Sequence, residues 1–143
     1  MRAETVVFAG DCTGPVLMLD EPLSFWGGLD PETGVITDAR HPQRGKSLAG
    51  HILLMPGTRG STSAAGALCE ALRQGNGPVA IILPAPDALI LTAVTIAREL
   101  YDRVTPVVTI GCANWPELCR CGLLHIGVEG ELSPLPAKRR QSD

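Results

Sequence analysis

Aromatic residues are scarce in this chain of 143 residues, since Phe, Trp and Tyr together make up only 3% of it. Hydrophobic residues nevertheless make up 45%, so the core must consist of Val, Ile, Leu and Ala, as in sheets covered by helices. The length is that of one domain and is sufficient to bury such a core. We therefore expect a single domain over residues 1–133 and a frayed tail over residues 134–143.

A strong charge of either sign is also missing. Twelve basic residues stand against 15 acidic ones, which gives a formal net charge of −3. A protein that binds nucleic acid needs a clustered basic face to neutralise phosphates. The only basic cluster, Lys138–Arg140, lies in the expected tail and is typical of a solvated terminus. The composition therefore predicts no nucleic-acid partner.

No uninterrupted apolar run is long enough to span a bilayer, and Met1–Glu4 leads into a strand pattern rather than an apolar signal region. We expect no membrane association and a cytoplasmic location. Five cysteines is an odd number, which disfavours a disulfide framework. The spacing of Cys112, Cys119 and Cys121 matches neither a zinc ribbon nor a common ferredoxin pattern, so we expect no metal in this chain.

The first half of the chain contains short strand patterns separated by turn residues. Thr5–Ala9 and Pro15–Leu19 flank the turn-rich segment Gly10–Gly14, and this arrangement predicts a hairpin. A brief strand at Val35–Thr37 follows an irregular stretch, and the polar loop His41–Gly50 leads to the next strand.

The second half has the pattern of a βαβ unit. Two β-branched runs, Pro78–Leu83 and Val104–Ile110, flank a predicted helix at Asp87–Tyr101, and Gly122–Ile126 predicts a last strand. Asp87 is the expected N-cap of that helix. Its predicted inward stripe consists of Ala88, Leu91, Thr92, Thr95 and Ile96. Together the two halves predict a mixed α/β domain.

The chemistry is expected in the loop that follows the strand His51–Met55. After this loop, Ala67, Leu68, Ala71 and Leu72 recur at helical spacing, which places Ser61 at a strand-to-helix junction. The first turn of a helix has unpaired N–H groups and favours negative charge. The loop lacks the lysine of a phosphate-binding P-loop and the flanking glycines of a hydrolase nucleophile elbow. Ser61 could therefore be a stabilised alkoxide or simply a helix N-cap.

Three blocks of the sequence resemble the small subunit of aconitase X. They are Leu23–Gly34, which contains Phe-Trp-Gly-Gly, then His41–Gly50, and finally Arg59-Gly60-Ser61. The similarity extends from about Glu4 to Ile110, and the spacing of three separate blocks is more specific than any one of them.

The resemblance implies a swivelling β/β/α domain of the aconitase type, with a mixed sheet and flanking helices, that works only with a separate large subunit. The family removes water from small hydroxy acids, and an iron–sulfur cluster in the large subunit acts as Lewis acid on the leaving hydroxyl. No cofactor is then expected on this chain. Bacterial members dehydrate cis-3-hydroxy-L-proline and archaeal members mevalonate 5-phosphate. We favour hydroxyproline, because ten of the twelve basic residues are arginine and the Lys and Glu enrichment of hyperthermophiles is missing.

The resemblance also assigns roles to residues. Ser61 matches the catalytic base, and Arg59, Gly60, Thr62 and Ser63 become candidate substrate-binding residues. An exposed arginine is equally typical of a solvated charge, and the Thr62 and Ser63 hydroxyls commonly satisfy amides of a first helical turn.

Outside the loop, Phe25 and Trp26 are candidate anchors for the large subunit, with packing on the core as the alternative. His41 could contact substrate, but a surface-loop histidine is the favoured interpretation. The competing class of function is a non-catalytic anion-binding or interaction module. Phosphotransfer is disfavoured because Gly57–Ser63 contains no histidine.

Overall fold

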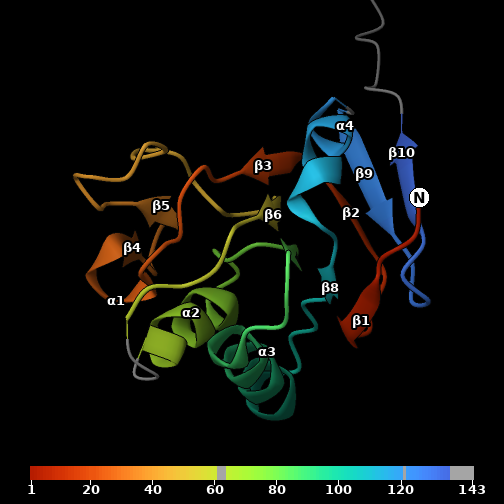
Figure 1. Cartoon of the computed structure of the whole chain (residues 1–143). Helices are drawn as coiled ribbons and strands as arrows, with labels where there is room; N and C mark the ends of the chain where they lie inside the picture. The colour runs from red at the N-terminus through yellow and green to blue at the C-terminus, as the bar shows by residue number, and fades with distance from the viewer. Residues whose placement is uncertain (61–63, 121, 136–143) are drawn as a thin grey trace, which may run out of the picture.

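The computed structural model describes residues 1–60, 64–120 and 122–135, and its centre is a five-stranded sheet (Figure 1). The strand order is β1-β8-β7-β6-β3. All neighbouring strands are parallel except β1, which pairs antiparallel with β8. The strands are β1 (Thr5–Phe8), β3 (Val16–Met18), β6 (Ile52–Leu54), β7 (Ala80–Leu83) and β8 (Val107–Thr109).

The three inner strands are buried along their whole length, which explains their continuous apolar sequences. Successive side chains of a strand point to opposite faces. Leu53 and Ile81 accordingly belong to the core on one face, whereas Ile52 and Ile82 belong to a second core on the other. The central sheet therefore lies between two covering layers.

Helices α2 (Ala64–Arg73) and α3 (Ala88–Tyr101) form one of these layers, below the sheet in Figure 1. The predicted stripe of α2 is confirmed in that Leu68, Ala71 and Leu72 are buried, while Ala67 is partly buried. The predicted stripe of α3 is wrong. Its buried residues are Leu89, Ile90, Ala93, Val94 and Ala97, and the expected inward residues Ala88, Leu91, Thr92, Thr95 and Ile96 are exposed. The helix has apolar side chains on both faces, so its periodicity alone did not fix which face is inward.

The other layer is a three-stranded antiparallel sheet with the order β10-β9-β2. Its strands are β2 (Cys12–Gly14), β9 (Leu123–Ile126) and β10 (Leu132–Leu135). A short 3-10 turn, η1 (Cys112–Asn114), and helix α4 (Trp115–Cys119) complete this side. The Trp115 indole donates a 2.9 Å hydrogen bond to the Ile110 carbonyl and joins this second core. The architecture is thus β/β/α, a mixed sheet with flanking helices, as expected.

Two expectations need correction. Strands β1 and β3 do not form a hairpin, because β1 pairs with β8 and β3 pairs with β6. The connection that looked like a turn contains β2, whose partner β9 lies more than a hundred residues along the chain. Pro134 and Leu135, expected in a frayed tail, pair with β9 as part of β10, and residues 136–143 lie outside the described residues.

A smaller substructure lies beside the carboxyl end of β3. It consists of the irregular turn α1 (Phe25–Gly28) and the paired strands β4 (Leu29–Asp30) and β5 (Val35–Ile36). Gly34 turns into β5 with φ of +74°, and an added Cβ there would lie 2.1 Å from the Asn76 carbonyl oxygen, so only glycine fits. No helix in the described part of the chain could cross a membrane.

Candidate functional site

The loop that leaves β6 runs alongside the segment that precedes α1. The Leu23 amide donates to the Gly57 carbonyl at 3.3 Å, and the Arg59 amide donates to the Leu23 carbonyl at 3.1 Å. Leu23 and Thr58 thereby form an isolated parallel bridge. Because Leu23 is buried in the core, this pairing fixes one side of the loop to the body of the domain.

Asp87 fixes the other side of the loop. One carboxylate oxygen, Oδ1, accepts hydrogen bonds from the Leu89 and Ile90 amides at 2.9 and 3.2 Å, which confirms Asp87 as the N-cap of α3. The second oxygen, Oδ2, accepts from the Thr58 hydroxyl at 2.8 Å and the Thr58 amide at 3.3 Å. This second role of Asp87 was not predicted from the sequence. The feature that could have indicated the contact with Thr58 is that Thr58 and Asp87 follow the carboxyl ends of two adjacent parallel strands.

Gly60 and Arg59 lie at the exposed end of the fixed loop. Gly60 has φ of +103°, a conformation that side chains rarely allow, and the nearest atom to an added Cβ would be the Ser24 hydroxyl at 3.5 Å. Glycine is therefore required at position 60 by the backbone angle and not by a lack of space for a side chain. The Arg59 guanidinium is half exposed and lies 3.8 Å from a carboxylate oxygen of Glu21. Such an exposed pair is weak, so the guanidinium can exchange Glu21 for another anion.

Ser61, Thr62 and Ser63 lie outside the described residues. Their neighbours on both sides are described. Gly60 ends the fixed loop, and Ala64 is the first and fully buried residue of α2. The roles predicted for the three hydroxyl residues therefore remain predictions.

The two aromatic residues of α1 have opposite environments. Phe25 is completely buried in the core, so it takes the packing role that was the alternative to an interface anchor. Trp26 is 73% exposed. The Ser24 hydroxyl donates to the Trp26 carbonyl at 3.0 Å and also lies next to Gly60. An exposed indole therefore lies on the segment that runs beside the loop.

His41 is not the surface-loop histidine that we favoured, because only 5% of it is exposed. Its Nδ1 accepts a hydrogen bond from the Gln43 amide at 3.1 Å, so the proton is on Nε2, which lies 3.2 Å from the Glu21 carbonyl and donates to it. Both ring nitrogens are used by the protein. His41 therefore joins two loops and is not free to bind a substrate.

No group of three or more His, Cys, Asp or Glu side chains in the described residues could hold a metal ion. Cys112 is exposed, and Cys121 lies outside the described residues. The described residues do not fit an iron–sulfur cluster.

The architecture and the fixed loop define the class of domain. The structure of Thermococcus kodakaraensis aconitase X in its holo form matches with a TM-score of 0.78 and 30% identity, and it covers 94% of this chain and 96% of that one. A solution NMR structure of a UPF0107 protein matches with a TM-score of 0.77 and 27% identity over 94% and 98% of the two chains. The chain therefore has the three-layer fold of the aconitase X domain.

The sequence comparison gives the family. The model of the aconitase X swivel domain matches residues 1–119. This chain belongs to the aconitase X swivel-domain family, which confirms the resemblance seen in the sequence.

Curated relatives are of two kinds. Cis-3-hydroxy-L-proline dehydratase of Hypocrea jecorina is 38% identical over 114 residues, which are 80% of this chain and 19% of that protein. The phosphomevalonate dehydratase small subunit of Methanothermobacter thermautotrophicus is 40% identical over 99 residues, which are 68% of this chain and 76% of that subunit. The chain spans about a fifth of the length of the hydroxyproline dehydratases that it matches.

Proposed function

We propose that this chain is the small subunit of a two-subunit hydro-lyase that removes water from a small hydroxy acid. Membership of the swivel-domain family is the observation that carries this proposal. Two further facts support it. Dehydratases are the relatives with which the chain aligns, and the relatives called small subunits are close to this chain in length, since it covers 76% of one of them.

In this proposal Ser61 is the base that takes a proton from the carbon next to the substrate carboxylate. The electron pair of that C–H bond forms the new double bond as the hydroxyl leaves the neighbouring carbon, and the proton and the hydroxyl together make the water released. A serine can do this only if its charged form is favoured by cations and hydrogen bonds. Arg59 and the amides at the start of α2 are the groups of this chain that can supply them.

The remaining loop residues orient the substrate. The Arg59 guanidinium exchanges Glu21 for the substrate carboxylate. Gly60 allows the backbone to approach the substrate closely, and the Thr62 and Ser63 hydroxyls contribute hydrogen bonds to the same anion. The iron–sulfur cluster, which would assist departure of the hydroxyl, belongs to the large subunit in this proposal. The exposed Trp26 contacts that subunit.

The favoured substrate is cis-3-hydroxy-L-proline. Loss of water gives the enamine Δ2-pyrroline-2-carboxylate, which becomes Δ1-pyrroline-2-carboxylate when the proton on the ring nitrogen moves to the carbon that lost the hydroxyl. Two curated relatives, from Hypocrea jecorina and Pseudomonas aeruginosa, are each 38% identical and carry that activity in their names. Mevalonate 5-phosphate is the second candidate, because a relative named as a small subunit, 40% identical, is a phosphomevalonate dehydratase. Both candidates are small hydroxy acids with a carboxylate that Arg59 can bind.

The test is reconstitution of the full chain with the large subunit of the same organism, followed by assay with both substrates. We expect no turnover by this chain alone and turnover by the pair. Product formed from mevalonate 5-phosphate but not from hydroxyproline would reverse the choice of substrate. Anion binding by the chain with no activity in an assembled pair would favour a non-catalytic module.

Ser61→Ala tests the base. Loss of one acid–base group typically lowers the rate by about 10²–10⁴, so the assembled pair should lose nearly all turnover. Ser133→Ala is the matched control, because Ser133 is exposed on β10 in the second sheet. Undiminished kcat in a Ser61→Ala pair that assembles normally would exclude Ser61 as the base.

A further inference from the structure

A cavity of about 270 Å³ lies at the opposite edge of the central sheet from the loop of Thr58–Gly60. It is lined by Val79, which precedes β7, and by Thr105, which precedes β8. The loop, in contrast, follows the carboxyl end of β6, and β6, β7 and β8 are parallel. The cavity is therefore a second site, independent of the proposed reaction.

Arg103 supplies a cation at the rim of this cavity. Its guanidinium nitrogens lie 3.8 and 3.9 Å from where a Cβ of Gly75 would be. Within the described ranges, the side chain forms no ion pair or hydrogen bond. None of the lining residues is acidic. The guanidinium is therefore available to an anion from outside the chain.

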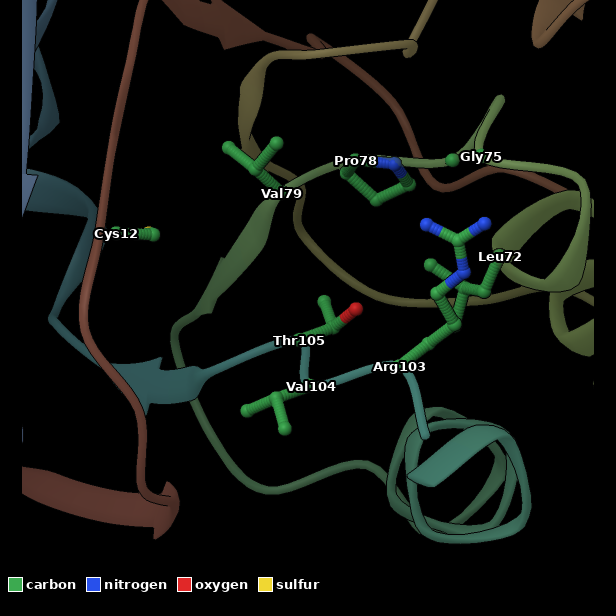
Figure 2. A pocket seen from close by; sticks show the side chains of 9 residues that line it. Cys12, Leu72, Gly75, Pro78, Val79, Arg103, Val104 and Thr105 are labelled. Atoms are coloured by element: carbon green, nitrogen blue, oxygen red, sulfur yellow. The ribbon is translucent and has the colours of Figure 1, made fainter. Parts of the chain in front are cut away.

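Thr105 supplies a polar group from the floor of the cavity. Only 3% of the residue is exposed, and its hydroxyl has no hydrogen-bond partner among the residues that the structure describes. The hydroxyl oxygen itself is open to the cavity, since the buried side-chain polar atom without a partner in the described residues is Glu131 Oε2, so a ligand can reach it. Figure 2 shows the Thr105 hydroxyl turned toward the side of the cavity where Arg103 lies. A ligand oxygen at this point would satisfy both groups.

The rest of the lining is apolar or neutral. Pro78, Val79 and Val104 form its walls, and Cys12 closes it from the second sheet (Figure 2). Burial, with a smaller contribution from the Asp11 carboxylate, raises the pKa of the Cys12 thiol to about 11, so this thiol is uncharged at neutral pH. The cavity therefore combines one positive charge and one hydroxyl with a lining that is otherwise uncharged.

We propose that this cavity binds a small organic monocarboxylate. The carboxylate pairs with the Arg103 guanidinium and accepts a hydrogen bond from the Thr105 hydroxyl, while a short apolar body packs against the proline and valine walls. The volume of about 270 Å³ lies just below the range of about 300–1,000 Å³ usual for drug-sized ligands, so a small carboxylate fits within it. A phosphate dianion fits less well, because a single guanidinium would face two charges in an otherwise uncharged site.

The test is a two-dimensional NMR titration of the full chain with propanoate. We expect saturable shifts at the Thr105 amide and the Arg103 side chain. Arg103→Gln should weaken the Kd by about tenfold, as for loss of a charged hydrogen bond, and Thr105→Val by about threefold. Arg98→Gln is the matched control, because Arg98 is an exposed arginine of α3 that does not line the cavity, and its Kd should not change.

Two further ligands make the result decisive. Propanamide, which has the same shape without the charge, should not bind. A Kd for propanoate that Arg103→Gln leaves unchanged in a folded variant would overturn the proposal, and so would a failure of propanoate to saturate the shifts. Tighter binding of inorganic phosphate than of propanoate, lost in Arg103→Gln, would also overturn the assignment of a monocarboxylate.

Discussion

Asp87 should make a larger contribution to stability than an ordinary helix cap, because its two carboxylate oxygens bind two different elements. Loss of an N-cap costs about 0.5–2 kcal/mol. Each of the two hydrogen bonds to Thr58, at 2.8 and 3.3 Å, contributes about 0.5–1.5 kcal/mol to the free energy of unfolding. We therefore expect Asp87→Ala to lower the free energy of unfolding by roughly 2–3 kcal/mol.

Asp87→Asn separates the two roles. The amide oxygen can still cap α3, but the amide nitrogen then faces the Thr58 N–H, which is also a donor. The expected cost is about 1 kcal/mol, between the wild type and Asp87→Ala. A double-mutant cycle with Thr58→Val should give a coupling energy of about 0.5–1.5 kcal/mol, since the two side chains are in direct contact.

Denaturant unfolding at pH 7 measures these differences. Glu99→Ala is the control, because Glu99 is exposed on α3 and, within the described part of the chain, pairs only with exposed Arg98. Its effect should be within about 0.5 kcal/mol. The reasoning is refuted if Asp87→Ala costs no more than this control. It is also refuted if Asp87→Ala and Asp87→Asn cost the same and the coupling to Thr58 is zero.

Three further predictions concern Phe25, Trp26 and Cys12. Phe25→Ala should lower the free energy of unfolding by about 3–5 kcal/mol, because the ring is completely buried. Trp26→Ala should leave unfolding nearly unchanged but weaken association with the large subunit in a pull-down titration, and equal association would exclude Trp26 from the interface. Because the pKa of the Cys12 thiol is raised from 9.0 to about 11, its contribution to stability is complete below pH 9 and is lost as the pH rises toward 11. Urea midpoints should fall over that interval and fall less in Cys12→Ala, whereas identical pH profiles of the two proteins would contradict the raised pKa.

Elements whose pattern is local were predictable from the sequence. The inner strands β6, β7 and β8 appear as continuous apolar runs because both of their faces are buried. Asp87 was predictable as a cap because a cap depends only on its own helix. The resemblance to aconitase X, which depends on three spaced blocks, supplied the layer arrangement.

Features that depend on distant partners were not predictable. Gly10–Gly14 has the composition of a turn. Strand β2 nevertheless forms there, because its backbone pairs with β9, which lies far along the chain. The inward face of α3 was misassigned because Leu91 and Ile96 are as apolar as the residues that actually pack on the sheet. The second contact of Asp87 depends on the spatial neighbourhood of β6 and β7, which no local pattern reports.

The anchoring of Thr58 between Leu23 and Asp87 has a mechanical consequence. A short peptide held by hydrogen bonds on both flanks behaves as part of the body to which it is attached. If this domain rotates against another polypeptide, Arg59 and Gly60 move with it as parts of one rigid body. Access to whatever they face can then be regulated by the angle of the whole domain, without any local refolding of the loop.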